Sequence, residues 1–147
     1  EFRGTLFRQT MFAEFEKIVH SKVESGEALT AEEFCRIYKG LNEKYFGAEV
    51  YIDDEISMEW ARIPHFYSSF YVYKYATGLS AAVSLSQQIL KEGTSAVERY
   101  LNFLGSGGSD YPLELLKKAG VDLSKPEPVN AALKVFESIL DELEEIL

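Results

Sequence analysis

One histidine and four tyrosines lie close together in the middle of the chain, between residues 65 and 75. The whole sequence has only two histidines and nine tyrosines. Tyr67, Tyr71 and Tyr75 recur every four residues, so on a helix they would lie along one face. A buried tyrosine hydroxyl needs a hydrogen-bond partner. Such a run is therefore a costly way to fill a core, but it can bring several hydroxyl donors to one substrate oxygen.

The spacing alone leaves two interpretations open. One is a stripe of aromatic core side chains with a single hydrogen-bonded histidine, and the other is a cluster of donors at a site. We expect the helix to begin at Pro64, because proline is tolerated in the first turn and favours an extended residue before it. His65 then lies in the first turn, and Tyr73 points to another face. The helix is expected to continue to about Leu90.

Composition limits the classes of protein that the chain can belong to. With 147 residues, 46% of them hydrophobic, it is long enough and apolar enough for one packed domain. Its net charge of −9 argues against nucleic-acid binding. The single Cys35 excludes an internal disulfide and a cysteine-based zinc site. No apolar run can span a membrane and no signal-peptide layout is present, so we expect a cytoplasmic protein with no membrane partner.

The periodicity is helical throughout and predicts an all-α helical bundle. Thr30 followed by Glu33 forms a capping box that marks one helix start. The last helix has apolar residues at alternating steps of four and three, which predicts a seam that closes the bundle. These seam residues are Val129, Leu133, Phe136, Leu140, Leu143 and Leu147. Besides 64–90, helices are predicted at 2–25, 31–46, 58–63, 94–104 and 112–118, and from 129 onward.

The search for a complete catalytic set fails. His20 and His65 lie 45 positions apart, no His-Glu-x-x-His pair is present, and no Ser-His-Asp or Cys-His arrangement is legible. No carboxylate pair has an apolar setting that would tune it for acid–base work. The glycine-rich stretch 105–112 lacks the order of a phosphate loop. It is either a helix–helix joint or a flexible loop beside a cleft. Taken alone, the chain is not a self-sufficient enzyme.

Three segments resemble one family. Residues 2–16, Phe-Arg-Gly-Thr-Leu-Phe-Arg-Gln-Thr-Met-Phe-Ala-Glu-Phe-Glu, are similar to the segment that follows the zinc site in oligoendopeptidase F. Residues 63–78 resemble that family's aromatic active-site helix, and residues 107–122 resemble its penultimate segment. These enzymes are bacterial zinc oligopeptidases related to thimet oligopeptidase. The three segments match in order, across nearly the whole chain.

The resemblance implies a helical, ellipsoidal, zincin-like peptidase whose deep channel admits only short peptides. In that family, zinc is held by the two histidines of His-Glu-x-x-His and a downstream glutamate, and the motif's glutamate activates water. All of these would lie upstream of Glu1, which is not an initiator methionine. We therefore expect residues 1–147 to be a single all-helical C-terminal part without metal ligands. It would be inactive alone and would pack against the zinc-bearing part of the same polypeptide.

The resemblance also implies roles for individual residues. His65 would donate to a substrate carbonyl, while Tyr67 and Tyr71 would stabilise the oxyanion and contact the peptide backbone. One such donor in a dry cleft is worth on the order of 3–4 kcal/mol. Residues implied in substrate binding alone are Tyr73, Tyr75, Gly107 and Gly108.

The alternative is a non-enzymatic helical protein-interaction module. A peptidase segment predicts that the hydroxyls of Tyr67 and Tyr71 face a groove or a missing surface. An interaction module predicts that both hydroxyls are buried and satisfied within the chain. A segment removed from its parent should also expose apolar surface and associate with itself.

Overall fold

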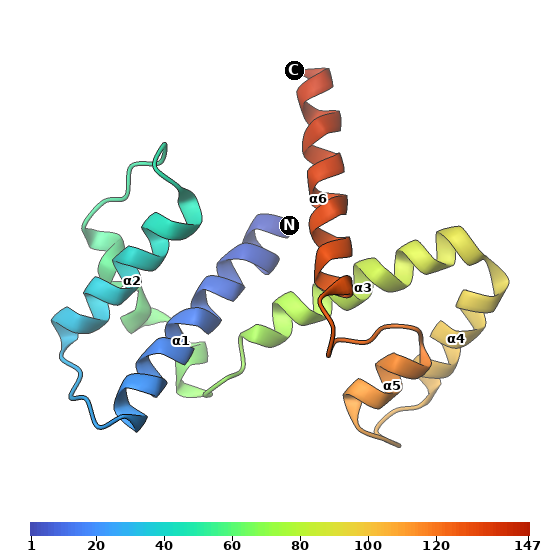
Figure 1. Cartoon of the computed structure of the whole chain (residues 1–147), viewed down its shortest axis with the longest axis horizontal. Coiled ribbons are helices and arrows are strands. Elements are labelled where there is room, and N and C mark those ends of the chain that lie inside the picture. Colours follow the sequence, from blue (N-terminus) through green and yellow to red (C-terminus); the bar gives the residue numbers. More distant parts are fainter. The chain divides into compact units, whose positions relative to one another are not determined.

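The structure is a computed structural model that describes residues 1–147, and all of its regular secondary structure is helical (Figure 1). The predicted all-α class is confirmed. The chain divides into two compact units, Glu1–Ala76 and Thr77–Leu147. Each unit has a hydrophobic core of its own. None of the helices is both long and apolar enough to cross a membrane.

The first unit begins with a continuous helical segment. A π-helical stretch, η1 (Arg3–Arg8), leads directly into α1 (Gln9–Glu24), which together match the predicted 2–25. Gly26 then turns the chain with a φ of +87°, a conformation that glycine adopts readily. The next helix, α2 (Ala31–Phe46), begins where the capping box predicts, because the Glu33 N–H donates to Thr30 Oγ1 at 3.3 Å. The Glu33 carboxylate pairs with Arg36 instead of reaching back.

The core of this unit is built from aromatic rings. Phe15 is 3% exposed, and its ring meets Tyr38 of α2 edge-on with centroids 5.2 Å apart. Phe66, which follows later in the chain, packs against Phe12 at 5.6 Å and against Phe15 at 5.3 Å. The segment that carries the predicted site is therefore anchored on α1.

A buried carboxylate ties a third element to this core. Glu59 lies in the 3₁₀ helix η2 (Glu55–Arg62), and its side chain is almost fully buried. It accepts hydrogen bonds from the Tyr38 hydroxyl at 2.7 Å and from Arg8 Nη2 at 2.6 Å, and it also pairs with Arg62. Burial favours the neutral acid, but these donors outweigh it and lower the pKa of Glu59 below its ordinary value. The ionised group joins η1, α2 and η2.

The aromatic helix predicted for 64–90 is wrong over its first turns. Residues Pro64–Tyr67 form a short 3₁₀ helix, η3, and the α-helix α3 spans only Tyr73–Glu92. Between them Phe70 has a φ of +58°, which lies in the left-handed region and interrupts a right-handed helix. Two serines precede Phe70, and serine favours turns over helix interiors. The Phe70 N–H donates to the side chain of Glu16 on α1, so it is used outside the helical pattern.

The second unit contains most of α3 together with α4 (Thr94–Gly105), α5 (Pro112–Lys118) and α6 (Glu127–Ile146). Its core is small and centres on Ala81, Leu85, Ala119 and Val121. Gly93 separates α3 from α4 with a φ of +69°, and Pro112 begins α5 as predicted.

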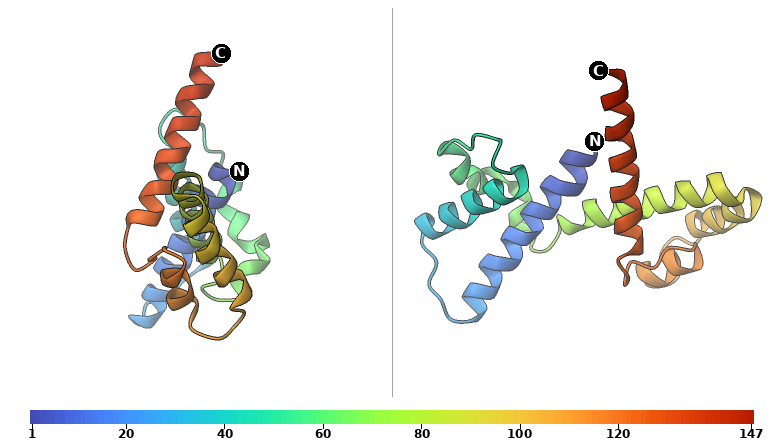
Figure 2. Two further views of the ribbon diagram at one scale, coloured as in Figure 1. Left: turned by 90° about the vertical axis from the view of Figure 1, so that its right-hand side faces the viewer. Right: turned by 45° about the horizontal axis from the view of Figure 1, so that its top comes forward.

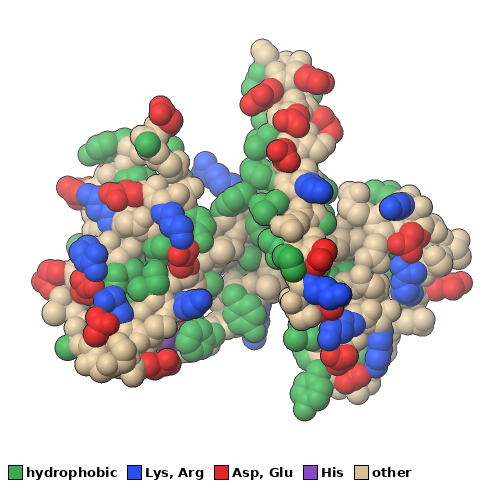
Figure 3. Space-filling view, viewed as in Figure 1, with side chains coloured by type: hydrophobic (Ala, Val, Ile, Leu, Met, Phe, Trp, Pro, Cys, Tyr) green, Lys and Arg blue, Asp and Glu red, His purple; other side chains and the backbone are tan.

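The predicted seam on the last helix is not closed by the other helices of its own unit. Leu140 and Leu143 are 42% and 48% exposed, and every residue from 137 onward is exposed. Figures 1 and 2 show that α6 extends beyond the other helices of its unit. In the space-filling view, hydrophobic side chains lie open along it among acidic ones (Figure 3). The a/d pattern correctly marks an apolar face, but no helix of this unit covers its C-terminal half.

Replacing Tyr38 by phenylalanine keeps the ring contacts but removes one donor from the buried Glu59 carboxylate. We expect Tyr38→Phe to lower the free energy of unfolding by about 1–3 kcal/mol at pH 7, as measured by urea denaturation. Tyr51→Phe is the matched control, since Tyr51 is 89% exposed, and it should change stability by less than about 0.5 kcal/mol. Equal effects of the two variants would contradict the contribution of the buried hydroxyl.

The same variant should be sensitive to pH. Because the folded-state pKa of Glu59 is lowered, its contribution is present above the unfolded glutamate pKa of about 4.3 and is lost as pH falls through the folded value. We therefore expect the difference in unfolding free energy between wild type and Tyr38→Phe to stay nearly constant down to about pH 5 and to shrink as the pH falls from about 4.3 through the lower folded pKa of Glu59. A difference that stays constant over this range would show that the contact does not depend on the ionised carboxylate.

Candidate functional site

Three of the predicted site residues come together around the turn between η3 and α3. The Tyr75 hydroxyl lies 3.3 Å from His65 Nε2. The rings of His65 and Tyr71 are nearly parallel, with an interplanar angle of 15° and centroids 5.8 Å apart. Tyr71 and Tyr75 meet edge-on at 5.6 Å. Tyr71 and Tyr75 therefore do meet, but across a turn and not along one helix face, and Tyr67, the third residue predicted on that face, lies apart in η3.

The electrostatics of this cluster favour the protonated form of the Tyr75 hydroxyl. A hydrogen bond between Tyr75 and Tyr71, together with partial burial, raises the pKa of Tyr75. The ammonium group of Lys74 lies 5.1 Å from the centre of the Tyr71 ring, within the range of a cation–π interaction. Tyr71 is 39% exposed, while His65 and Tyr75 are half-buried. The cluster thus presents one hydroxyl-bearing ring at the surface.

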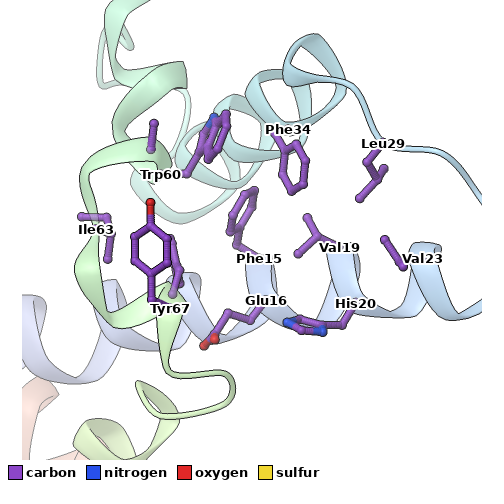
Figure 4. Close-up of a pocket in the computed structure, with 12 residues that line it drawn as sticks. Phe15, Glu16, Val19, His20, Val23, Leu29, Phe34, Trp60, Ile63 and Tyr67 are labelled. Carbon is purple, nitrogen blue, oxygen red and sulfur yellow. The ribbon is translucent and has the colours of Figure 1, made fainter.

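The other predicted residues have different settings. Tyr67 is 88% exposed at the end of η3, and its ring lies at the edge of a pocket (Figure 4). Tyr73 is exposed at the first position of α3. Gly107 and Gly108 belong to the second unit, where both are exposed in the turn between α4 and α5. Gly107 has a φ of +52°, which explains a glycine there.

The sequence reasoning missed the pocket beside Tyr67. It has a volume of about 470 Å³, which is within the range of small-molecule sites. Figure 4 shows that its side chains come from α1, from the loop before α2, from α2 itself and from the segment between Trp60 and Tyr67. Most of the lining is apolar, and besides the Tyr67 hydroxyl its polar members include Glu16 and His20, one turn apart on α1. The only signal in the sequence was the unusual width of the apolar surface on helix 2–25.

Glu16 is the second residue that the sequence reasoning missed. It is 3% exposed, and its Oε1 accepts the Phe70 N–H at 3.0 Å while Oε2 has no hydrogen-bond partner. Burial raises the pKa of this carboxyl. The prediction concerned carboxylate pairs, and it did not consider this single carboxylate in an apolar setting. Its neighbours in the sequence gave a signal, since Phe12, Phe15 and Val19 surround it on the helix.

The chain offers no metal centre of its own. Three or more histidine, cysteine, aspartate or glutamate side chains that could hold an ion do not come together anywhere in the structure. The residues present therefore do not fit a complete zinc site.

Comparisons with known proteins give a consistent result. The model of peptidase family M3 matches residues 2–135. The chain is 61% identical over 146 residues to the oligopeptidase PepF of Bacillus subtilis, which covers 99% of this chain and 22% of that protein. It is 47% identical to the plasmid-encoded oligoendopeptidase F of Lactococcus lactis subsp. cremoris, covering 99% of this chain and 24% of that protein.

The structural comparison agrees. The crystal structure of oligoendopeptidase-F from Enterococcus faecium matches 98% of this chain with a TM-score of 0.94 and 50% sequence identity, and the match covers 28% of that chain. The present chain thus spans less than a third of the length of these relatives. The family model covers most of the sequence and the fold matches throughout, so the chain belongs to peptidase family M3.

Proposed function

We propose that this chain is the C-terminal part of a zinc metallo-oligopeptidase that hydrolyses short peptides. In this proposal it supplies the residues that bind the peptide and stabilise the tetrahedral oxyanion. The observation that carries the proposal is the hydrogen-bonded cluster of His65, Tyr75 and Tyr71, which ends at a partly exposed hydroxyl. The relatives named oligopeptidase and oligoendopeptidase support peptides as the substrate class.

The cluster can act as a chain of donors. The raised pKa of Tyr75 comes first from its bond to Tyr71, which fits a Tyr75 proton held between the two oxygens. The Tyr75 oxygen then accepts from Nε2–H of His65, 3.3 Å away, and we assign that tautomer on this ground. The proton of Tyr71 can be directed at a substrate oxygen. Each hydroxyl in such a chain is polarised by the one before it.

This arrangement refines the role proposed for His65. Nε2 faces Tyr75, so the imidazole orients the tyrosine pair before substrate arrives. Tyr71 is then the donor to the developing oxyanion, where a prearranged hydroxyl is worth most. Tyr67, exposed at the edge of the pocket, is placed to contact the peptide backbone. The glycines at 107 and 108 would line the substrate path.

The metal would be held outside this chain, by residues of the remaining polypeptide. Bound zinc supplies the activation of water and the polarisation of the scissile carbonyl. The residues described here bind the peptide, orient it and hold a proton at the Tyr71 hydroxyl. The single Cys35 fits the further proposal that the enzyme works in the reducing cytoplasm.

The exposure of the tyrosines favours this function over a non-enzymatic interaction module. A module predicts that the hydroxyls of Tyr67 and Tyr71 are buried and satisfied. Tyr67 is instead 88% exposed and Tyr71 39% exposed. The open seam on α6 fits either function, because both leave an apolar face for another part to cover.

The proposal is tested with the complete polypeptide that contains this chain, acting on a quenched short peptide with and without a zinc chelator. Chelator-sensitive cleavage is expected, and His65→Ala, Tyr67→Phe and Tyr71→Phe should each lower turnover at least about tenfold, or about 1.4 kcal/mol. Tyr51→Phe, at an exposed loop position, should leave turnover unchanged. No cleavage by a folded, zinc-loaded polypeptide would overturn the enzyme function and leave a helical binding module.

The donor chain makes a separate prediction about Tyr75. Tyr75→Phe keeps the ring contacts but removes the hydroxyl that is hydrogen-bonded to both His65 and Tyr71. We expect kcat to fall about fivefold, the equivalent of one hydrogen bond of about 1 kcal/mol, with KM nearly unchanged. If His65→Ala slows Tyr75→Phe by the same factor as it slows wild type, the two residues act independently and the chain of donors is wrong.

A further inference from the structure

A single side-chain hydrogen bond tethers the turn between η3 and α3 to α1. Oε1 of Glu16 accepts the backbone N–H of Phe70 at 3.0 Å, across 54 positions of sequence. We propose that Glu16 is a positioning residue, which fixes this turn and thereby places Tyr71 against His65. The inference rests on the proposed role of Tyr71 in peptide hydrolysis and adds a residue that does not touch the substrate.

The backbone of the turn requires such a tether. Phe70 has a φ of +58° and is the one non-glycine residue of the chain in the left-handed region. A large side chain there is disfavoured by roughly 1 kcal/mol or more, so the surroundings must hold it. Two contacts do so, and both come from α1. Besides the bond to Glu16, the ring of His20 lies 4.6 Å from the ring of Phe70.

The position of the tether in the chain connects it to the site. Phe70 immediately precedes Tyr71, and Val72 on the other side is fully buried. Tyr71 is therefore held between a hydrogen bond at one neighbour and a core anchor at the other. On the far side of the turn, Phe66 is fixed by packing on α1. The three anchors of the turn are thus the hydrogen bond to Glu16, the packing of Phe66 and the burial of Val72. Only the hydrogen bond can be removed without taking an apolar side chain out of the core.

The setting of Glu16 argues that the fold alone does not explain this residue. The carboxylate is 3% exposed, one of its oxygens has no partner, and the walls around it are largely apolar. Burying a carboxylate with incomplete hydrogen bonding destabilises a protein, and an apolar side chain of similar size would avoid that cost. A glutamate is useful here because its carboxylate accepts the hydrogen bond from the Phe70 N–H.

The first test compares two substitutions in the complete, zinc-loaded polypeptide. Glu16→Met is similar in length but has no acceptor, whereas Glu16→Gln keeps an amide oxygen for the Phe70 N–H. We expect Glu16→Met to lower kcat about tenfold or more, because small displacements of a catalytic group are costly, with KM within about twofold of wild type. Glu16→Gln should stay within about threefold in kcat, and Glu24→Gln, at an exposed site of the same helix, should have no effect.

Coupling to Tyr71 separates positioning from a general loss of structure. If Glu16 acts through Tyr71, the double variant Glu16→Met with Tyr71→Phe should be no slower than Tyr71→Phe alone. If the two losses in kcat multiply, Glu16 acts elsewhere and the inference is overturned. Glu16→Ala serves as a second acceptor-free variant should Glu16→Met fail to fold.

Amide hydrogen exchange measured by mass spectrometry tests the tether without reference to activity. The segment 66–72 should exchange faster in the acceptor-free variants, and Glu16→Gln should restore the wild-type rate. The segment 34–46 of α2 is the internal control and should not change. A folded, zinc-loaded polypeptide without activity would overturn the proposed function. The exchange rates would still test whether Glu16 holds the turn. Equal exchange of 66–72 in all variants would overturn the tether.

Discussion

The burial of Phe15 is the interaction on which the first unit depends. Its ring contacts Tyr38 on α2 and Phe66 in η3, so one side chain of α1 holds together segments that lie far apart in sequence. Aromatic side chains bury large areas and prefer edge-on or tilted pairs, so these contacts both stabilise the core and fix the relative orientation of its elements. Because η3 docks on α1 through Phe66, the histidine and tyrosines that follow are presented from a fixed base.

Two buried glutamates show how the environment sets the state of one residue type. Glu59 receives hydrogen bonds from a tyrosine and an arginine, and its pKa is lowered despite burial. Glu16 receives one backbone N–H, and burial raises its pKa. The first glutamate joins three elements of the core as an ionised group. The second lies beside the turn that carries Tyr71, where its hydrogen bond to the Phe70 N–H is one of the contacts that hold the turn.

Local signals explain what the sequence could predict. The start of α2 depends on Thr30 and the start of α5 on Pro112, and each acts within a few residues. Tyr75 and not Tyr67 completes the cluster with His65 and Tyr71, although a grouping of His65 with nearby tyrosines was predicted. The break at 68–72 was not, since it depends on Glu16 at a distance of 54 positions. Periodicity reports an apolar face but not a contact made elsewhere in the fold.

The same limit applies to α6. The steps of four and three correctly identify an apolar face, yet they do not say which surface covers it, and the other helices of its unit leave the C-terminal half of that face open. Family resemblance supplied information of another kind, because it identified peptidase family M3 from ordered motifs. The roles of individual tyrosines still depended on geometry, and there the structure separates Tyr67 from Tyr71.

Because the seam of α6 is open, the stability of the folded chain depends on the concentration of whatever surface packs on that seam. Any surface that packs on the seam binds the folded helix and not the unfolded chain, so it raises the melting temperature as its concentration rises. A covering segment in the same polypeptide acts at a fixed effective concentration, whereas a second copy acts at the concentration of the sample. Diluting the protein therefore distinguishes the two, because only intermolecular cover is lost on dilution.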